Sequence, residues 1–269
     1  MKPTDAPKIE KATVKEFPEG IAAFGADALR FTFASLATHG RDIKFDMERC
    51  GGYKNFCNKL WNAARFVLMH CEDFTASGKP AASSEPERWL LSQLAAATEQ
   101  TQRHVADYRF DLASTALYEF TWNTYCDWFL EFAKPALAGD DAGAADSMRH
   151  TMLFALEATL RLLHPLMPFI TEEIWQTIAP KLGIGGISIS TQAFPEAADF
   201  GAADTHAVAN IEWLKALVAS IRSIRSEMGI SPAKSIPLLW QSANAEDKVR
   251  LASFEAGLKF LAKIESVTE

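Results

Sequence analysis

Apolar residues recur at intervals of three and four positions along most of the first 180 residues. Within residues 49–71, Phe56, Leu60, Ala63 and Val67 keep this spacing, which predicts an amphipathic helix. The same spacing predicts further helices at residues 25–38, 84–107, 111–132, 146–163 and 169–178. Because these helices are long and amphipathic and the segments between them are short, we predict a mainly α fold built on an antiparallel helical bundle.

Residues that begin and end helices support these boundaries. Ser84 and Glu87 have the spacing of a capping box, in which the side chain of each residue bonds to the backbone N–H of the other. Asp111 is expected to cap the helix that begins there. Pro135 and Gly139 are expected to close that helix after Phe132, because proline has no backbone N–H to donate and glycine is common just after a helix end.

The composition changes after residue 179. Residues 180–205 are rich in Gly, Pro, Ser and Ala and contain one β-like stretch, at 186–191. Helix and strand patterns then alternate, at residues 204–228 (helix), 236–241 (strand), 245–263 (helix) and 266–269 (strand). We therefore predict a small α/β appendage on the bundle. The chain divides into a linker with a connecting helix, the helical bundle and the small α/β subdomain, at residues 1–40, 41–180 and 181–269.

Composition and charge narrow the classes of function. The 269 residues are 48% hydrophobic and 23% charged, as in ordinary globular proteins. The net charge of −7 argues against an unfocused basic nucleic-acid binder but leaves room for a local basic patch. No apolar run approaches the roughly 18–20 residues that span a bilayer. The N-terminus also lacks the apolar core of a signal peptide, so we expect a cytoplasmic protein without membrane contact.

The sequence contains no motif for catalysis or for binding a metal or cofactor. The four cysteines form no Cys-x-x-Cys pair, and no glycine-rich phosphate loop or nucleophile elbow occurs. The adjacent acids Asp140-Asp141 and Glu172-Glu173 could form carboxylate pairs, but both lie near predicted helix starts. Capping and the helix dipole explain them more simply, and we expect Glu172-Glu173 in the first turn of its helix.

The segment 49–66 has an unusual charge. It contains four basic side chains and no acid, although the whole chain carries −7. Lys54, Asn58, Trp61 and Arg65 recur at i, i+4, i+7 and i+11, so they share one stripe of the helix. Single-stranded RNA is bound by this combination of cations for phosphates, amides for base edges and rings for stacking. The alternative is a solvated basic face in which Trp61 is simply buried.

A second, weaker basic cluster lies near the C-terminal end of the 204–228 helix. Arg222 and Arg225 are three residues apart and share a face, and Lys215 and Lys234 add charge nearby. The spacing fits either a nucleic-acid contact or an ordinary exposed helix surface.

Several long motifs resemble one protein family. The sequence N-F-C-N-K-L-W-N-A-A-R-F at residues 55–66 resembles the signature that opens the anticodon-binding domain of valyl-tRNA synthetases. Further segments resemble that family in the same order along the chain: G-A-D-A-L-R-F (25–31), G-R-D-I-x-F-D (40–46), W-N-x-Y-C-D-W-F-x-E (122–131), H-P-x-x-P-F-I-T-E-E-I-W (164–175) and I-R-x-I-R-x-E-M (221–228). The resemblance covers the whole chain.

This resemblance implies a module that recognises the anticodon stem-loop of valine tRNA. Together with the charge pattern, it assigns stem-loop contacts to Lys54, Asn55, Asn58 and Arg65, and backbone contacts to Arg222 and Arg225. The aromatic residues of the 111–132 helix, with Trp175, are expected to form the bundle core instead: Trp122, Tyr125, Trp128, Phe129 and Phe132.

Other parts of that family have no counterpart in this sequence. Nothing resembles the H-I-G-H or K-M-S-K-S motifs, which bind ATP in that family. Nothing resembles its editing domain or its C-terminal coiled coil either. The resemblance implies that ATP and valine react on the catalytic core of a longer parent enzyme. The present chain is then expected to be monomeric, to hold no catalytic residue, metal or cofactor, and to be inactive alone. A structural scaffold that packs on the catalytic core with little RNA contact is the alternative.

Overall fold

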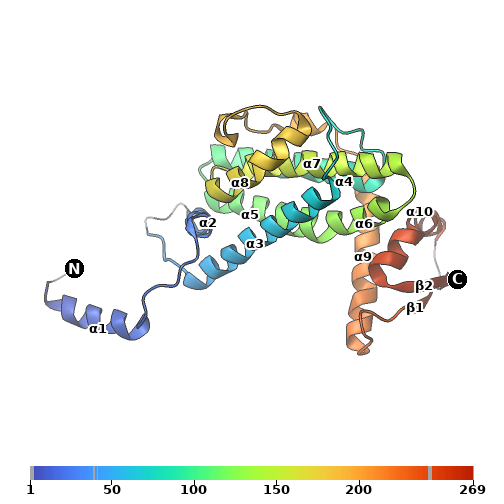
Figure 1. The fold of residues 1–269 in the computed structure, drawn as a ribbon. Coiled ribbons are helices and arrows are strands. Elements are labelled where there is room, and N and C mark those ends of the chain that lie inside the picture. The colour runs from blue at the N-terminus through green and yellow to red at the C-terminus, as the bar shows by residue number, and fades with distance from the viewer. Residues whose placement is uncertain (1–2, 39, 41, 242–243, 269) are drawn as a thin grey trace.

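The protein is described by a computed structural model that covers residues 3–38, 40, 42–241 and 244–268. Its helices form a bundle with a small α/β unit at one end (Figure 1). Two residues of predicted elements lie outside the described residues: Arg41, in the loop expected between the first two predicted helices, and Glu269, in the last predicted strand.

The helices are α1 (Ala6–Glu16), α2 (Ala26–Leu36), α3 (Met47–His70), α4 (Glu85–Ala106), α5 (Phe110–Glu119), α6 (Leu130–Ala138), α7 (Ala142–Leu163), α8 (Pro168–Ile178), α9 (Thr205–Glu227) and α10 (Ala245–Ala262). A π-helical segment, Phe120–Phe129, joins α5 to α6, and the strands are β1 (Ile236–Leu239) and β2 (Ile264–Thr268).

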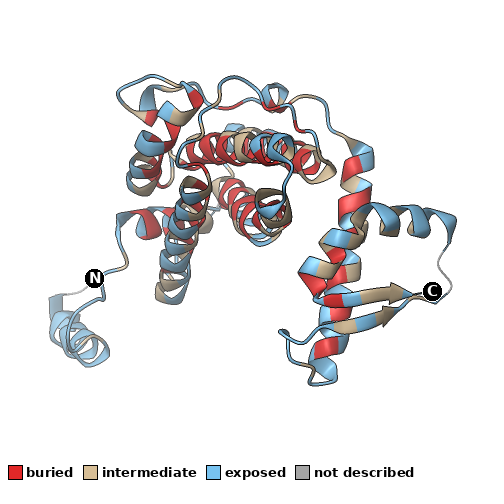
Figure 2. Cartoon of the chain, turned by 45° about the vertical axis from the view of Figure 1, so that its right-hand side comes forward, coloured by how far each residue is buried: buried red, intermediate tan, exposed pale blue. Residues whose placement is uncertain are grey.

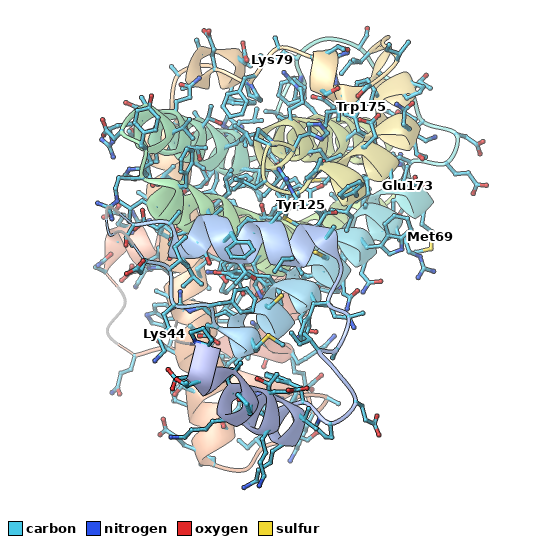
Figure 3. All side chains as sticks on the ribbon, turned by 90° about the vertical axis from the view of Figure 1, so that its left-hand side faces the viewer. Lys44, Met69, Lys79, Tyr125, Glu173 and Trp175 are labelled. Atoms are coloured by element: carbon cyan, nitrogen blue, oxygen red, sulfur yellow. The ribbon has the colours of Figure 1, made fainter. Side chains whose placement is uncertain are left out.

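The bundle core lies between α3, α4, α7 and the aromatic π-helical segment. Figure 2 shows the buried residues concentrated where these helices face one another. Tyr125, Phe129 and Phe132 are buried as predicted, and Trp175 lies with them in the interior (Figure 3). The Tyr125 hydroxyl donates to the Met152 carbonyl oxygen at 2.9 Å, so its one polar group is satisfied. Trp122 and Trp128 pack on this core but keep part of their surface exposed.

The predicted capping box is confirmed, and it does more than begin a helix. The Glu87 carboxylate accepts from the Ser84 backbone N–H at 2.8 Å and the Ser84 hydroxyl at 2.6 Å. It also accepts from the hydroxyls of Ser147 and Thr151 on α7, at 2.7 and 3.0 Å. Only 1% of Glu87 is exposed, so the cap of α4 is also a buried link to α7.

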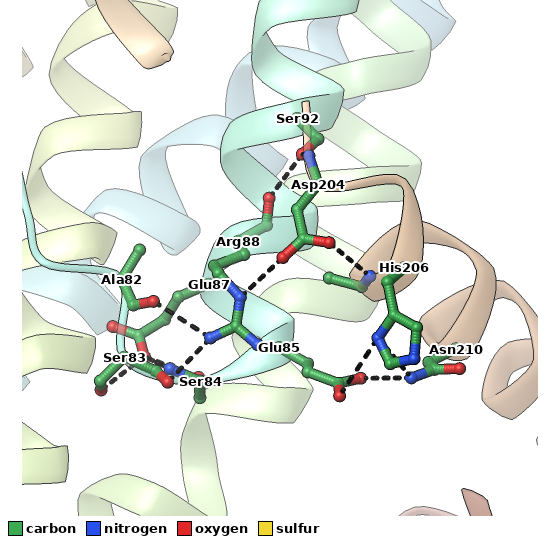
Figure 4. Close-up of polar contacts among 11 residues, drawn as sticks. Ala82, Ser83, Ser84, Glu85, Glu87, Arg88, Ser92, Asp204, His206 and Asn210 are labelled. Carbon is green, nitrogen blue, oxygen red and sulfur yellow. Dashed lines mark hydrogen bonds and ion pairs between the residues drawn. The ribbon is translucent and has the colours of Figure 1, made fainter. Parts of the chain in front are cut away.

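A second polar cluster joins the start of α4 to the start of α9 (Figure 4). The Arg88 guanidinium donates to the Asp204 carboxylate at 2.8 Å, and the Asp204 backbone N–H donates to the Ser92 hydroxyl at 2.9 Å. Asp204 also caps α9 by accepting from the Ala207 backbone N–H. This cluster fixes where the α/β unit leaves the bundle.

The helix predicted from residue 111 differs at both ends. It begins at Phe110, and Asp111 is not its cap but forms a two-bond ion pair with Arg109. It also continues through Pro135 to Ala138, by way of the π-helical segment, so Pro135 does not close it, whereas Gly139 follows its last residue as predicted. Burial of Phe132 and its neighbours keeps the chain helical there, although proline leaves one backbone bond unmade.

Two further predictions near α7 and α8 need correction. Helix α7 begins four residues before residue 146, because Asp141 caps it. Glu172 lies beyond the first turn of α8, so the role predicted for it at the helix dipole was wrong. Its carboxylate instead accepts from the Ser188 hydroxyl and the Ile189 backbone N–H, at 2.8 and 3.2 Å. These bonds hold Ile189–Thr191 as a short helical turn, and residues 186–191 do not form the predicted strand.

The α/β appendage is confirmed. Strands β1 and β2 pair in parallel, with Ile236 opposite Ile264, and α10 connects them. Helix α9 contacts both α4 and α10, so it joins the unit to the bundle. Helix α1 was not predicted, and it lies apart from the bundle with every residue exposed (Figure 1). Within the described ranges, no helix is long and apolar enough to cross a membrane.

Candidate nucleic-acid interface

The predicted polar stripe lies on the solvent side of α3. Asp46 caps the helix by accepting from the backbone N–H groups of Glu48 and Arg49. The helix then buries Phe56, Leu60 and other apolar residues against its neighbours. The opposite side presents the exposed side chains that we call the α3 row: Lys54, Asn55, Asn58, Trp61 and Arg65.

The polar members of the α3 row are largely free of protein partners. The Lys54 ammonium lies 3.4 Å from the Ala23 carbonyl oxygen, its hydrogen-bond acceptor. Asn55, Asn58 and Arg65 make no hydrogen bond or ion pair with any residue that the structure describes. Their donors and acceptors therefore remain available to a ligand.

Trp61 bears on one part of the alternative interpretation of this segment. Its side chain is 42% exposed, so it is not the buried core residue that the alternative required. A large exposed aromatic ring beside amides and cations is typical of surfaces that stack bases.

Lys59 shows where the sequence pattern was incomplete. It lies next to the α3 row, but its ammonium pairs with the Asp127 carboxylate and lies 5.2 Å from the Trp122 ring. Its charge is therefore directed towards the bundle. The partners come from the π-helical segment, so the spacing of residues on α3 alone could not identify them.

A small cavity that the sequence did not reveal adjoins Lys59. It holds about 190 Å³ between α3, the π-helical segment and α6. Its polar and aromatic lining comes from Asn62, Phe66, Glu131 and Lys134 as well as Lys59. Lys134 pairs with Glu131 and lies 5.9 Å from the Phe66 ring. The cavity thus combines amide, carboxylate, ammonium and ring surfaces in a space that suits a flat polar group.

The second predicted basic cluster faces the α/β unit. Arg222 is exposed, donates to the Leu261 carbonyl oxygen at 3.1 Å and lies 5.6 Å from the Trp128 ring. Arg225 is only 5% exposed, and its guanidinium donates to backbone carbonyl oxygens. The geometry leaves Arg222 accessible, but it gives no support to a direct RNA contact by Arg225.

Comparison with known proteins identifies the family. Residues 87–240, more than half of the chain, match the family described as "Anticodon-binding domain of tRNA ligase". The chain belongs to this family. The α3 row precedes the matched segment, which runs from the first turn of α4 to just past the end of β1.

Curated relatives extend the likeness over the whole chain. The sequence is 56% identical over 267 residues to a valine–tRNA ligase of Stenotrophomonas maltophilia (strain R551-3). It is 58% identical over 268 residues to a valine–tRNA ligase of Xanthomonas axonopodis pv. citri (strain 306). Each alignment covers 99% of this chain but 28% of the relative, so the anticodon-binding domain spans about a quarter of their length.

A solved structure is similar at lower identity. It is a ternary complex of the agnB2 LeuRS of Agrobacterium radiobacter K84 with tRNA and LeuAMS. The similarity has a TM-score of 0.49 at 20% identity, and it covers 74% of this chain and 21% of that one.

The cysteines of the anticodon-binding domain are placed as structural residues. Burial raises the pKa of Cys57 and of Cys71 to about 11, and that of Cys126 to about 12. These thiols therefore stay protonated near neutral pH and are poor nucleophiles. Among the described residues, no group of three His, Cys, Asp or Glu side chains could hold a metal ion.

Proposed function

We propose that this chain binds the anticodon stem-loop of valine tRNA through the α3 row. The observation that carries the proposal is a set of exposed cations and amides with few or no protein partners, on one face of a helix in an acidic chain. In this proposal Lys54 and Arg65 contact phosphates, because ammonium and guanidinium groups attract the polyanion without regard to sequence. Asn55 and Asn58 contact base edges, since an amide can both donate and accept.

The neighbouring cavity supports the same proposal. A base that is turned out of the loop would enter between the Phe66 ring and the Lys59–Asp127 pair, within reach of Asn62. Single-stranded RNA is read in this way, by stacking and by hydrogen bonds to exposed base edges. Arg222 would add a backbone contact, while Arg225 would act through the protein interior.

The catalytic step belongs to the longer protein in this proposal. There, ATP and valine give valyl-adenylate and then valyl-tRNA on a catalytic core outside the present sequence, in the cytoplasm. The chain alone, as a monomer, would hold the tRNA without cofactor and would show no valine-dependent ATP–pyrophosphate exchange.

A second function, docking on the rest of the longer protein, is favoured by one separate observation. An apolar cavity of about 360 Å³ lies between the segment before α2 and the start of α3, lined by residues such as Phe24, Leu29 and Phe45. Leu29 and the nearby Phe33 are 41% and 46% exposed. Such a surface suits the catalytic core, and if it were the main role the chain would bind little RNA.

Filter binding of an unmodified valine anticodon hairpin tests the proposal. We expect Lys54→Gln and Arg65→Gln to weaken binding and to reduce the log–log salt slope by about 0.7 for each phosphate that the protein no longer neutralises. Lys259→Gln is the matched control, because Lys259 is paired with Glu255 on α10, away from α3. If both α3 variants bind like the unchanged chain, the docking role is the better description.

A further inference from the structure

An open groove of about 700 Å³ lies where the end of α9 meets the end of α10. Three cationic side chains line it, namely Arg222, Arg225 and Lys263, together with the hydroxyl residues Ser226 and Ser231. None of the described residues that line the groove is acidic. In a chain of net charge −7, a groove with this lining is a local positive site.

The charge at the groove wall has no protein counter-ion among the described residues. Arg225 is only 5% exposed, and its guanidinium donates to the carbonyl oxygens of Ser231 (2.6 Å), Ala262 (3.1 Å) and Lys263 (3.4 Å), and also to that of Lys234. All four acceptors are neutral, and no carboxylate in the described part of the chain pairs with Arg225. Buried charges are normally paired, so this arginine stands out.

The end of helix α10 balances only part of this charge. The last turn of a helix carries about half a negative charge on its free carbonyl groups, and Arg222 and Arg225 donate to two of them, Leu261 and Ala262. Two guanidinium groups and the Lys263 ammonium together carry three positive charges. Lys263 is exposed, and its ammonium lies 5.2 Å from the Phe260 ring with no carboxylate of the described residues beside it. The groove therefore keeps a net positive charge that an anion would neutralise.

We propose that this groove binds a phosphate group of the RNA backbone. The inference rests on the proposed tRNA function and adds a second contact site, on the α/β unit. Arg222 and Lys263 contact the phosphate directly, and buried Arg225 strengthens the field at the groove wall. The lining contains no amide side chain and no aromatic ring, so the groove would add affinity rather than read bases.

Binding of an unmodified full-length valine tRNA transcript to the chain, measured over a series of salt concentrations, tests this inference. We expect Lys263→Gln and Arg222→Gln each to weaken binding about two- to fivefold, as for one exposed ion pair. Each should also reduce the log–log salt slope by about 0.7–0.9. Arg222→Lys, which keeps the charge, should retain the slope. Lys259→Gln is the control, since Lys259 lies in the last turn of α10, near Lys263, and pairs with Glu255 outside the groove.

The α3 variants Lys54→Gln and Arg65→Gln, measured in parallel, separate this inference from the proposed function. If they lose affinity while the groove variants keep full affinity and slope, the groove inference and the backbone contact of Arg222 are wrong, and stem-loop binding through the α3 row stands. If only the groove variants lose affinity, the α3 row is the wrong interface. A chain that binds no tRNA at all overturns both. Inorganic phosphate, compared with chloride at equal ionic strength, tests for a free-anion site through the stability of the chain against unfolding. If the groove variants lose this phosphate-dependent stabilisation but bind tRNA like the unchanged chain, the groove holds free anions and the RNA assignment fails.

Discussion

Replacing Glu87 with alanine removes a buried carboxylate that accepts hydrogen bonds from five groups, at the start of α4 and on α7. Its oxygens accept from the Ser84 backbone and hydroxyl at the start of α4, and from Ser147 and Thr151 on α7. A further bond comes from the Ser83 hydroxyl at 3.2 Å. The substitution therefore removes the cap of one helix and a link between two helices together.

The structure sets the size of the effect. Loss of the helix cap destabilises the fold by about 1 kcal/mol. The Thr151 hydroxyl is fully buried, and leaving it without its acceptor destabilises the fold by about a further 1–3 kcal/mol. Ser147 is partly exposed and can bond to water instead. We therefore expect Glu87→Ala to lower the free energy of unfolding by about 2–4 kcal/mol.

Glu87→Gln distinguishes the geometry of the site from its charge. Glutamine keeps one oxygen for the Ser84 backbone N–H, and its amide can donate to hydroxyls that turn to accept. Glutamine removes only the stronger, charge-assisted part of each hydrogen bond, so we expect Glu87→Gln to lower the free energy of unfolding by about 1 kcal/mol.

Urea titration followed by circular dichroism measures both variants, and a double-mutant cycle with Thr151→Val isolates the link to α7. This account of the buried cluster is wrong if Glu87→Ala and Glu87→Gln destabilise the protein equally. It is also wrong if the cycle shows no coupling between Glu87 and Thr151.

Three further substitutions or reactions test single side chains. Asn58→Ala should relax the preference for the valine anticodon without changing the salt slope, because an amide carries no charge; a slope change in filter binding would contradict its role at a base edge. Phe129→Ala should lower stability by about 3–5 kcal/mol, and more than Trp128→Ala does, since Phe129 is fully buried and Trp128 is not; equal thermal midpoints would count against this packing. Burial raises the pKa of Cys57 to about 11, so its alkylation by iodoacetamide should be slow at pH 8 and should accelerate towards pH 11; a fast reaction at pH 8 would show that the thiol is not shielded.

Local sequence determined most helix positions. The spacing of Phe56, Leu60 and Val67 places α3 correctly, and the Ser84–Glu87 capping box places the start of α4. These signals involve residues within one or two helical turns, so they do not depend on the rest of the fold. The same reasoning placed Lys54, Asn58 and Arg65 on one exposed stripe, because helical geometry alone decides which residues share a face.

Tertiary structure decided what each polar group does. The charge pattern could not distinguish Lys59, which Asp127 binds, from Arg65, which stays free of described partners. Nor could it show that Arg225 is buried against the carbonyl groups at the end of α10 while Arg222, three residues earlier, is exposed. Tertiary burial also carries the helix through Pro135, against its local preference. Each outcome depends on which groups from distant parts of the chain come within hydrogen-bond distance, and on whether water can reach them, and neither is set by neighbouring residues.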